Sequence, residues 1–400
     1  MHKGGINMSN LWKRAKALGP EFAKVRQNIH QHPELGMEEV RTSGIVAEYL
    51  RGLGLEVTAH VANTGVVGLL CGGQPGKTIA LRADMDALTI PERSGVPFAS
   101  LEPGKMHACG HDGHTAILMG VAKLLTEMKA EIHGNVKFLF QPAEEALPGG
   151  AAPMIEAGVL ENPHVDAAMG LHLSTDIPTG QIGLMAGASC AAADMIQIKI
   201  SGKGGHGAHP HKSIDAIAAA GYVIVALQTI ASREIDPLGS VVVTLGTING
   251  GYRNNVIADQ VLITGTVRTL DPVVRASMPE RIERILSGVC EALRCGHELT
   301  YEHGYPSIVN DPQMADLVEL AAQKLLGIGN VLRLPVPSMG GEDFSYFAAK
   351  VPAIYFRLGG GNVEKGCIYP GHHPQFNFDE DAIPVGMAVT VAAVLEFLNK

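Results

Sequence analysis

The stretch MHACGHDGHTA, residues 106–116, places three histidines, a cysteine and an aspartate within eight consecutive positions. Residues of these types suit three kinds of site. Cysteine and histidine are common ligands of zinc and similar transition metals. A cysteine near a histidine can instead form a nucleophile with its base, and a histidine-rich loop can lack any chemical role. Gly110 and Gly113 argue against a regular helix before about Thr115, so spacing alone leaves the three interpretations open.

Further polar residues follow segments that are predicted to be buried strands. The segment 77–88, KTIALRADMDAL, begins apolar and ends in carboxylates. The segment 135–145, NVKFLFQPAEE, is stopped by a proline before two glutamates, and 166–173, DAAMGLHL, carries a histidine. In open parallel sheets, ligands bind beyond the carboxyl ends of the strands. The candidates at these ends are Asp84, Asp86, Glu144, Glu145 and His172.

The adjacent residues Glu144 and Glu145 have a specific use in metal chemistry. If one carboxylate coordinates a metal ion, its neighbour can accept the proton of the metal-bound water and deliver it to a leaving amine. The less specific alternatives are a solvated loop or a helix N-terminus, where carboxylates are favoured. Taken alone, His172 fits a hydrogen-bonded core histidine as well as a ligand, and His372 and His373 fit an ordinary loop.

These residues must be positioned by more than one domain, because 400 residues exceed one ordinary core. In the first part of the chain and again near its end, apolar strands alternate with helices such as 115–128. This pattern predicts an α/β domain with a mostly parallel sheet and helices on both faces. The order strand–helix–strand–strand–helix–strand within 189–305 predicts an α+β, ferredoxin-like domain. We expect a catalytic domain built from residues 1–188 and 306–400, with the smaller domain inserted.

The composition excludes several classes of protein. Hydrophobic residues make up 46% of the chain and charged residues 18%, which suits a folded globular protein. The 31 basic and 40 acidic side chains give a net charge of −9 without a Lys/Arg run, which disfavours nucleic acid as a partner. No 18-residue apolar run, signal-peptide pattern or CxxC pair occurs, so we expect a cytoplasmic protein that does not bind membranes. Residues 1–7 precede Met8, a second candidate start.

Eight motifs occur in a fixed order along the chain: MHACGHDGHTA, QPAEE, GLH, GGHGAHPH, NNVIADQ, GTVRT, GEDFSYF and HHPQF. Together they resemble the hippurate hydrolase, N-acyl-amino-acid amidohydrolase and auxin-conjugate hydrolase branch of the dinuclear-metal aminoacylase and carboxypeptidase family. The resemblance extends from NIHQHPELGMEE at 28–39 to HHPQFNFDE at 372–380. It implies a metal-dependent amidohydrolase that cleaves the amide bond of N-acyl or N-aroyl amino acids, and its alternative is a carboxypeptidase or dipeptidase of broader specificity.

The resemblance also implies two divalent metal ions per subunit, whether zinc, manganese, cobalt or nickel. The implied ligands are Cys109, His111, Glu145, His172 and His372. Glu144 is implied as the general base, and Cys109 as a ligand shared by both ions. His372 is preferred to His373 because the ligand of the family stands two residues before the proline of the motif, here Pro374.

One position departs from more distant relatives, which carry a ligand histidine in an HxD motif. The equivalent stretch here is Arg82-Ala83-Asp84. Because this branch supplies His111 instead, Asp84 is expected to orient a ligand.

In the inserted domain, the resemblance implies a lid and dimerisation role. His206 of GGHGAHPH would stabilise the oxyanion formed at the scissile carbonyl. This histidine often comes from the partner subunit in the family, which implies a homodimer or a dimer-based homo-oligomer. Asn255 and Arg268 resemble residues that hold the α-carboxylate of the small-molecule substrate, for which arginine is well suited. The family commonly reads NVIP where this chain reads NVIA at 255–258, and an ordinary surface charge is the alternative for Arg268.

Two further hypotheses belong to other classes of protein. A cysteine hydrolase would use Cys109 with a nearby histidine, resist chelators and leave the other predicted ligands idle. A non-enzymatic zinc-stabilised protein would need closed four-ligand coordination. It would have no use for Glu144 beside a ligand, and therefore the residues favour a catalytic metal site.

Overall fold

The computed structural model describes residues 8–399. Residues 1–7, whose origin the second candidate start at Met8 leaves open, lie outside the described residues. The chain forms two compact units. The first unit runs to Gly187 and resumes over Val309–Val336 and from Asp343 onward. The second unit comprises Ala188–Ile308 and the short segment Pro337–Glu342. The second unit is therefore inserted into the first in sequence.

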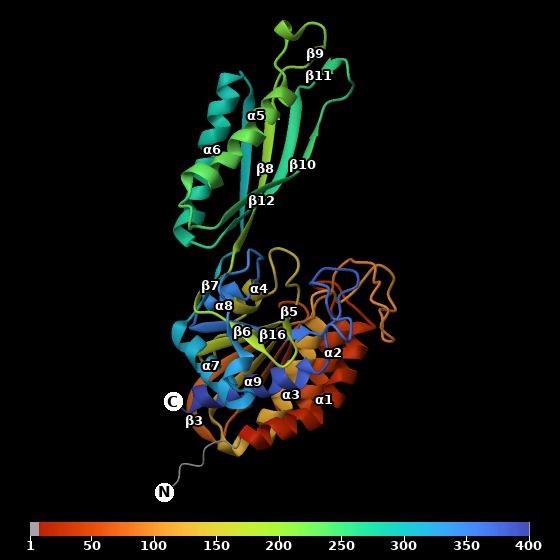
Figure 1. Ribbon diagram of the computed structural model, residues 1–400, viewed down its shortest axis with the longest axis vertical. Helices are drawn as coiled ribbons and strands as arrows, with labels where there is room; N and C mark the ends of the chain where they lie inside the picture. Colours follow the sequence, from red (N-terminus) through yellow and green to blue (C-terminus); the bar gives the residue numbers. More distant parts are fainter. Residues whose placement is uncertain (1–7, 400) are drawn as a thin grey trace. The chain divides into compact units, whose positions relative to one another are not determined.

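An eight-stranded mixed sheet forms the centre of the first unit (Figure 1). Its strands are β1 (Glu56–Val61), β2 (Gly65–Cys71), β3 (Gln74–Asp84), β4 (His133–Gln141), β5 (Ala167–Pro178), β6 (Ile182–Leu184), β15 (Val331–Arg333) and β16 (Ala353–Gly361). They lie in the order β1-β2-β4-β3-β5-β16-β6-β15. The central pairs β4–β3, β3–β5 and β5–β16 are parallel, whereas β1–β2, β2–β4 and β16–β6 are antiparallel. The predicted mostly parallel α/β sheet is confirmed.

Helices cover the two faces of this sheet unequally. The long helices are α1 (Met8–His30), α2 (Val40–Gly52), α3 (His111–Glu127), α7 (Pro312–Leu326) and α9 (Ala382–Leu398). Along β16, Ile354, Phe356 and Leu358 join the core that also contains α9. Tyr355 points the other way and stacks on Phe344, with ring centroids 5.1 Å apart. The opposite face therefore carries the short helices α8 (Ser345–Ala348) and α4 (Ala151–Glu156), which contact each other.

Helix α3 begins at His111, so the predicted start near Thr115 is wrong. Gly110 precedes the helix with φ +92°, a left-handed conformation that glycine adopts without steric strain. Gly113 lies inside the first turn, where a Cβ would come within 2.5 Å of Phe378 Cζ. Both glycines were expected to break the helix, whereas Gly110 caps its start and Gly113 permits close packing.

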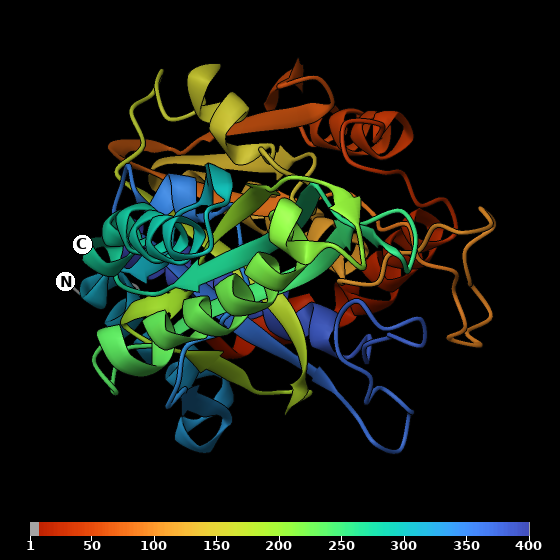
Figure 2. The same ribbon diagram turned by 90° about the horizontal axis from the view of Figure 1, so that it is seen from above.

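The second unit contains a four-stranded antiparallel sheet with two helices on one face. Its main elements are β8 (Ala192–Ser201), α5 (Ala216–Thr229), β10 (Val241–Gly250), β12 (Gln260–Thr269), α6 (Pro272–Ala292) and β13 (Gly296–Tyr305). The sheet order is β10-β12-β8-β13, the split βαβ order that the sequence predicts. Figure 2 shows α5 and α6 side by side along the sheet, and the two helices contact each other. The apolar side chains of β8, Ile196, Ile198 and Ile200, are buried beneath them.

Four short strands complete the secondary structure used below. In the second unit, β9 (Gly205–His206) pairs with β11 (Val256–Ile257). Strands β7 (Gly187–Cys190) and β14 (Ile308–Asn310) lie where the chain passes between the units in sequence. Asp215 and Asp271 accept backbone N–H groups at the starts of α5 and α6, which satisfies donors that a helix leaves unpaired.

Among the described residues, one helix, Ala216–Glu234, is long and apolar enough to cross a membrane by length and composition. It comprises α5 and the π-helical turn Ile230–Glu234. Ala216, Ala219, Ala220, Val223 and Leu227 belong to the core of the second unit. A core helix of this composition passes the same test, so the finding is weak evidence for a membrane span.

Candidate metal centre

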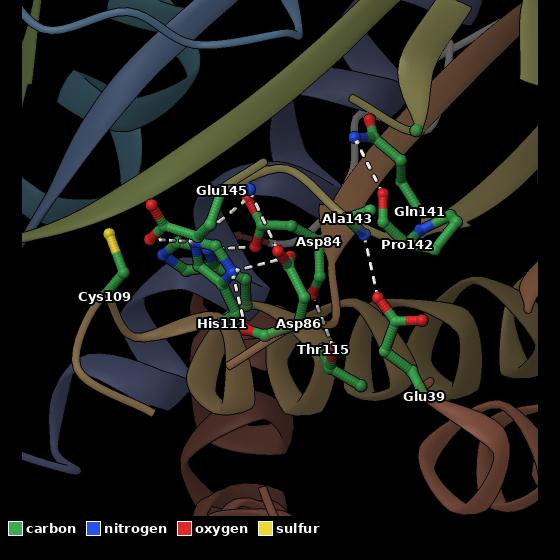
Figure 3. A network of polar contacts seen from close by, with 12 residues as sticks. Glu39, Asp84, Asp86, Cys109, His111, Thr115, Gln141, Pro142, Ala143 and Glu145 are labelled. Carbon is green, nitrogen blue, oxygen red and sulfur yellow. Dashed lines mark hydrogen bonds and ion pairs between the residues drawn. The ribbon is translucent and has the colours of Figure 1, made fainter. Parts of the chain in front are cut away.

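Polar side chains from separate segments converge beyond the carboxyl ends of β3 and β4. Asp84 ends β3 and Asp86 follows it, while Glu144 and Glu145 lie in the loop after β4. His111 is the first residue of α3. Figure 3 shows His111 beside Glu145, with Asp84 and Asp86 adjacent to both. The ends of two parallel neighbouring strands and a helix N-terminus thus assemble one buried polar cluster, as expected for this edge of an open sheet.

Two groups of potential metal ligands share Cys109. Sulfur and nitrogen atoms of Cys109, His111 and His172 lie within 4.8 Å of one another. Atoms of Cys109, Glu145 and His372 satisfy the same limit. All five belong to the first unit, although they are far apart in sequence. The arrangement can therefore hold two ions around one thiolate.

The tautomer of His111 leaves one nitrogen available as a ligand. Its Nδ1 lies 3.0 Å from the Asp86 carbonyl oxygen and 3.2 Å from Asp86 Oδ1, so Nδ1 donates its proton to Asp86. The buried Nε2 makes no hydrogen bond to any described residue. It faces Asp84 Oδ2 at 3.6 Å and Glu145 Oε1 at 3.9 Å. A divalent cation can replace the proton of Nε2 at this position, because nitrogen and carboxylate oxygen are ligands of transition metals.

His172, on strand β5, also has one ring nitrogen fixed by a hydrogen bond and the other directed at a candidate ligand. Its Nδ1 lies 2.6 Å from the Leu173 carbonyl oxygen, which accepts the proton. The Nε2 atom faces Cys109 Sγ at 3.4 Å. Burial lowers the pKa of His172 well below its usual value, so the ring is neutral. A neutral imidazole with a fixed Nδ1–H is the form that binds metals through Nε2.

Glu145 and His372 complete the second ligand group. His372 Nε2 lies 3.1 Å from Glu145 Oε1, and the His372 N–H donates to the Ala108 carbonyl oxygen at 2.7 Å. His373 instead stacks on Tyr369, with ring centroids 4.5 Å apart. The structure thus places His372, rather than His373, beside the other candidate ligands.

The electrostatics of the cluster favour a cation. Burial alone lowers the pKa of His111, but the neighbouring carboxylates of Asp84 and Asp86 outweigh it and raise the pKa well above its usual value. Burial raises the pKa of the Cys109 thiol to about 12, and the nearby Glu145 charge acts in the same direction. Such a thiol is a poor nucleophile at neutral pH, whereas metal binding would take its proton. The donor set, its charge and the unpaired His111 nitrogen therefore fit metal ions.

Asp84, which was expected to orient a ligand, hydrogen-bonds residues outside the predicted ligand set. Its Oδ1 accepts from His114 Nδ1 at 2.6 Å, and its Oδ2 accepts from Arg82 Nη1 at 2.6 Å. His114 Nε2 in turn accepts the Leu173 N–H at 2.9 Å. The carboxylate that orients His111 Nδ1 is Asp86. Asp86 was predicted only as a polar residue at a strand end, although its position in RADMD, two residues after Asp84, was a signal for this role.

A second buried polar network holds the start of α3 from the side of α1. Asp112 Oδ2 accepts from Arg26 Nε at 2.7 Å and lies 2.8 Å from His30 Nδ1. The Arg26 guanidinium also lies over the rings of Phe98 and Phe378, 4.6 and 4.4 Å from their centroids. Burial acts to raise the pKa of Asp112, but Arg26 and His30 hold it far below its usual value. The network fixes the residue that follows His111.

The three candidates of the second unit do not lie together. His206 is exposed and pairs in register with Val256, next to Asn255. Arg268 lies toward the other end of β12, opposite Ala193, whereas Gln260 at the near end pairs with Ser201. Gln260 and Arg268 are eight residue steps apart along the strand, which is about 26 Å at the rise of a strand. The structure brings His206 and Asn255 together and keeps Arg268 apart.

Potential cysteine, histidine and glutamate ligands, with a second glutamate beside them at the edge of a mostly parallel sheet, are typical of a metal-dependent hydrolase. Residues 80–396 match the model of the family described as Peptidase family M20/M25/M40. The chain belongs to this family.

Three relatives cover most of this chain. It is 43% identical to thermostable carboxypeptidase 2 of Saccharolobus solfataricus over 94% of this chain and 95% of that protein. It is 45% identical to an N-acyl-L-amino acid amidohydrolase of Geobacillus stearothermophilus over 71% of this chain and 76% of that protein. A crystal structure of a dinuclear metal binding peptidase of the M20 family from Bacillus subtilis aligns with a TM-score of 0.84 and 35% identity, covering 96% of this chain and 99% of that one.

Proposed function

We propose that this enzyme hydrolyses the amide bond of N-acyl or N-aroyl amino acids, releasing an amino acid and a carboxylate. The observation that carries the proposal is the placement of Glu144. A carboxylate oxygen of Glu144 lies within 4.8 Å of potential ligand atoms of both His111 and Glu145. The name of the Geobacillus relative, N-acyl-L-amino acid amidohydrolase, supports the substrate class.

The proposed ligands are Cys109, His111, Glu145, His172 and His372. Bound metal ions would supply an acidified water and a Lewis acid for the scissile carbonyl. His111 and His172 are held in the ligating tautomer by acceptors at Nδ1. Asp84 supports the site less directly, because it holds His114 and Arg82 beneath it.

Glu144 is the proposed general base. It accepts a proton from the attacking water and delivers it to the leaving amine nitrogen. The position is only 7% exposed, so few solvent molecules compete with the substrate water. Its neighbour Glu145 serves as a ligand, which gives the two adjacent carboxylates different tasks.

His206 is the proposed oxyanion donor. Its Nδ1 accepts the Ala208 N–H at 3.0 Å, so the proton of a neutral ring is on Nε2. An exposed Nε2–H can donate to the carbonyl oxygen as negative charge develops there. Arg268 and Asn255 are the proposed contacts of the α-carboxylate of the substrate.

A homodimer follows from the separation of these residues. The scissile carbonyl and the α-carboxylate of an amino-acid amide are only a few atoms apart. His206 lies on β9, beyond the end of β12 at Gln260, and Gln260 is itself about 26 Å from Arg268 along the strand. The two residues of one chain therefore cannot contact the same substrate within one second unit. We infer that one subunit supplies His206 and Asn255 and the other supplies Arg268, and that the second unit is the dimerisation domain.

A carboxypeptidase of broader specificity is the second candidate, because a thermostable carboxypeptidase is among the relatives. A panel of N-acetyl amino acids, N-benzoyl amino acids and dipeptides, assayed with enzyme of measured metal content, separates the two. An amidohydrolase cleaves acyl and aroyl substrates with the higher kcat/KM. A higher kcat/KM for dipeptides would contradict the first proposal.

The six cysteines are free thiols, which supports a reducing compartment such as the cytoplasm.

A further inference from the structure

The sequence motif HPELGMEE, residues 32–39, has no part in the proposed chemistry. It packs against the loop after β4 that carries Glu144 and Glu145, here called the catalytic loop. Glu34 accepts the Ala87 N–H through its backbone oxygen at 2.8 Å, just beyond the end of β3. Gly36 lies under Ala143, where a Cβ on Gly36 would be 2.9 Å from Ala143 Cβ. The motif is therefore in contact with the residue that precedes Glu144.

Glu39, the last residue of this motif, binds the catalytic loop directly. Its buried carboxylate accepts the Ala143 N–H through Oε1 at 2.8 Å, as Figure 3 shows. Its other oxygen accepts the Thr64 hydroxyl. The chain leaves the β4 ladder at Gln141, and Pro142 has no N–H to donate. The Ala143 N–H would be buried without a partner if Glu39 were absent.

The backbone around Glu144 has a conformation that requires such support. Ala143 has φ +51°, in the left-handed region that residues with a Cβ rarely adopt. On the other side of Glu144, the Glu145 N–H donates to Asp86 Oδ2 at 2.9 Å. The peptide N–H groups on both sides of Glu144 are thus each bound to a buried carboxylate.

We propose that Glu39 is a positioning residue for the Glu144–Glu145 pair. By holding the Ala143 N–H, it keeps the peptide in the left-handed turn that aims Glu144 at the substrate water and Glu145 at the ions. The inference rests on the roles proposed for Glu144 and Glu145. Glu39 acts as a hydrogen-bond acceptor, and its charge is not required.

The test compares two substitutions of Glu39. Glu39→Ala removes the acceptor and lowers kcat by roughly 10–100-fold, the effect expected of misplaced catalytic groups, with KM little changed. Glu39→Gln keeps an amide oxygen for Ala143 and restores kcat to within a few-fold of wild type. Lys137→Ala is the matched control. It removes another buried side chain that binds loop backbone, here the Val159 carbonyl at 3.0 Å, and leaves kcat unchanged.

A second pair of variants tests the same turn without altering Glu39. Gly36→Ala places a methyl group too close to Ala143, which displaces the turn that carries Glu144. The displacement lowers kcat about 10-fold or more. Gly44→Ala in α2 has nothing within 4 Å of the new Cβ and leaves kcat unchanged. The visible spectrum of Co²⁺-loaded protein gives a readout besides activity. It shifts in Glu39→Ala and Gly36→Ala, because Glu145 moves, and stays unchanged in both controls.

The outcomes separate this inference from the proposed function. Normal kcat in both Glu39→Ala and Gly36→Ala, with kcat abolished in Glu144→Gln, would overturn the role of Glu39 alone. A kcat in Glu39→Gln as low as in Glu39→Ala would also overturn it, because the charge would then be essential. Normal kcat in Glu144→Gln would overturn the general base itself. If Glu39→Ala does not fold, Gly36→Ala and Glu39→Gln decide the question.

Discussion

Arg268 lies toward one end of the ladder between β8 and β12, whereas His206 lies on β9, beyond the other end of that ladder (Figure 1). Eight residue steps along β12 separate Arg268 from Gln260 at that other end. Strand pairing on both sides makes β12 a rigid spacer, with β10 on one side and β8 on the other. If both residues act on one substrate, they belong to two different copies of the second unit. The proposed composite site would thus be a consequence of strand length.

His206→Ala is expected to lower kcat and kcat/KM together by about 10²–10³-fold, because a donor to the oxyanion acts in the transition state. Metal content, measured by mass spectrometry, should not change. A loss of stability with little loss of rate would mean that His206 only supports its loop.

Mixing His206→Ala with Glu144→Ala protein tests the composite site. A mixed dimer contains one site with both residues intact and one with neither, so activity should partly return. Unchanged inactivity after proven subunit exchange would place the histidine in its own chain's site.

Arg268→Ala should raise KM for N-acyl amino acids by about 10-fold or more, because a charge-assisted hydrogen bond contributes roughly 1.5–3 kcal/mol. The same substitution should have little effect on the corresponding amino-acid amides, which lack the carboxylate. Steady-state kinetics on the two substrate series make the comparison. Equal losses on both series would exclude carboxylate recognition by Arg268.

Removal of divalent metal by prolonged chelation should abolish amide hydrolysis, and Zn²⁺, Mn²⁺, Co²⁺ or Ni²⁺ should restore it. The expectation follows from two ligand groups that share Cys109. Retained activity in protein shown to be metal-free would refute the proposed chemistry and favour the cysteine hydrolase.

Glu144→Gln should lower kcat by roughly 10²–10⁴-fold, the range of a general base, while metal content stays near wild type. Glu145→Ala should instead lose metal, because it removes a ligand. The number of bound metal ions and kcat are measured for both variants, which distinguishes a general base from a ligand. Loss of metal in both variants would show that Glu144 and Glu145 do not have separate roles.

Asp112→Asn should destabilise the first unit by about 1.5–3 kcal/mol at pH 7, because it removes the charge that Arg26 and His30 contact, while Glu380 keeps an ion pair with Arg26. The pKa of Asp112 is depressed in the folded protein. Its contribution is therefore fully present above the unfolded value of about 3.9 and decreases as the pH falls below it. Denaturant unfolding at a series of pH values should show that the free energies of unfolding of the wild-type protein and Asp112→Asn converge below pH 4. A difference between the two free energies that stays constant down to pH 2 would contradict a depressed pKa of Asp112.

The sequence allowed prediction of the sheet classes because strand periodicity and the order of elements are local properties. It also named the residues that the fold brings together around Cys109, although those assignments depended on the resemblance to a family. The start of α3 was missed because Gly113 accommodates Phe378, a contact between residues 265 positions apart in the chain. Asp86 and Glu39 were given no role for the same reason, since their hydrogen bonds to His111 and Ala143 are tertiary.

The position of strand β16 in the sheet determines when the first unit can fold during synthesis. It lies between β5 and β6 inside the sheet of the first unit, yet it is the last strand in sequence. The nascent chain cannot complete this sheet until Gly361 has left the ribosome, because β5 and β6 have no bridging strand before then. Apart from Pro337–Glu342, the second unit ends at Ile308 and is available for folding earlier. The unit completed later is the one that contains the candidate metal centre, and its ligand group with His372 cannot form before nearly the whole chain is translated.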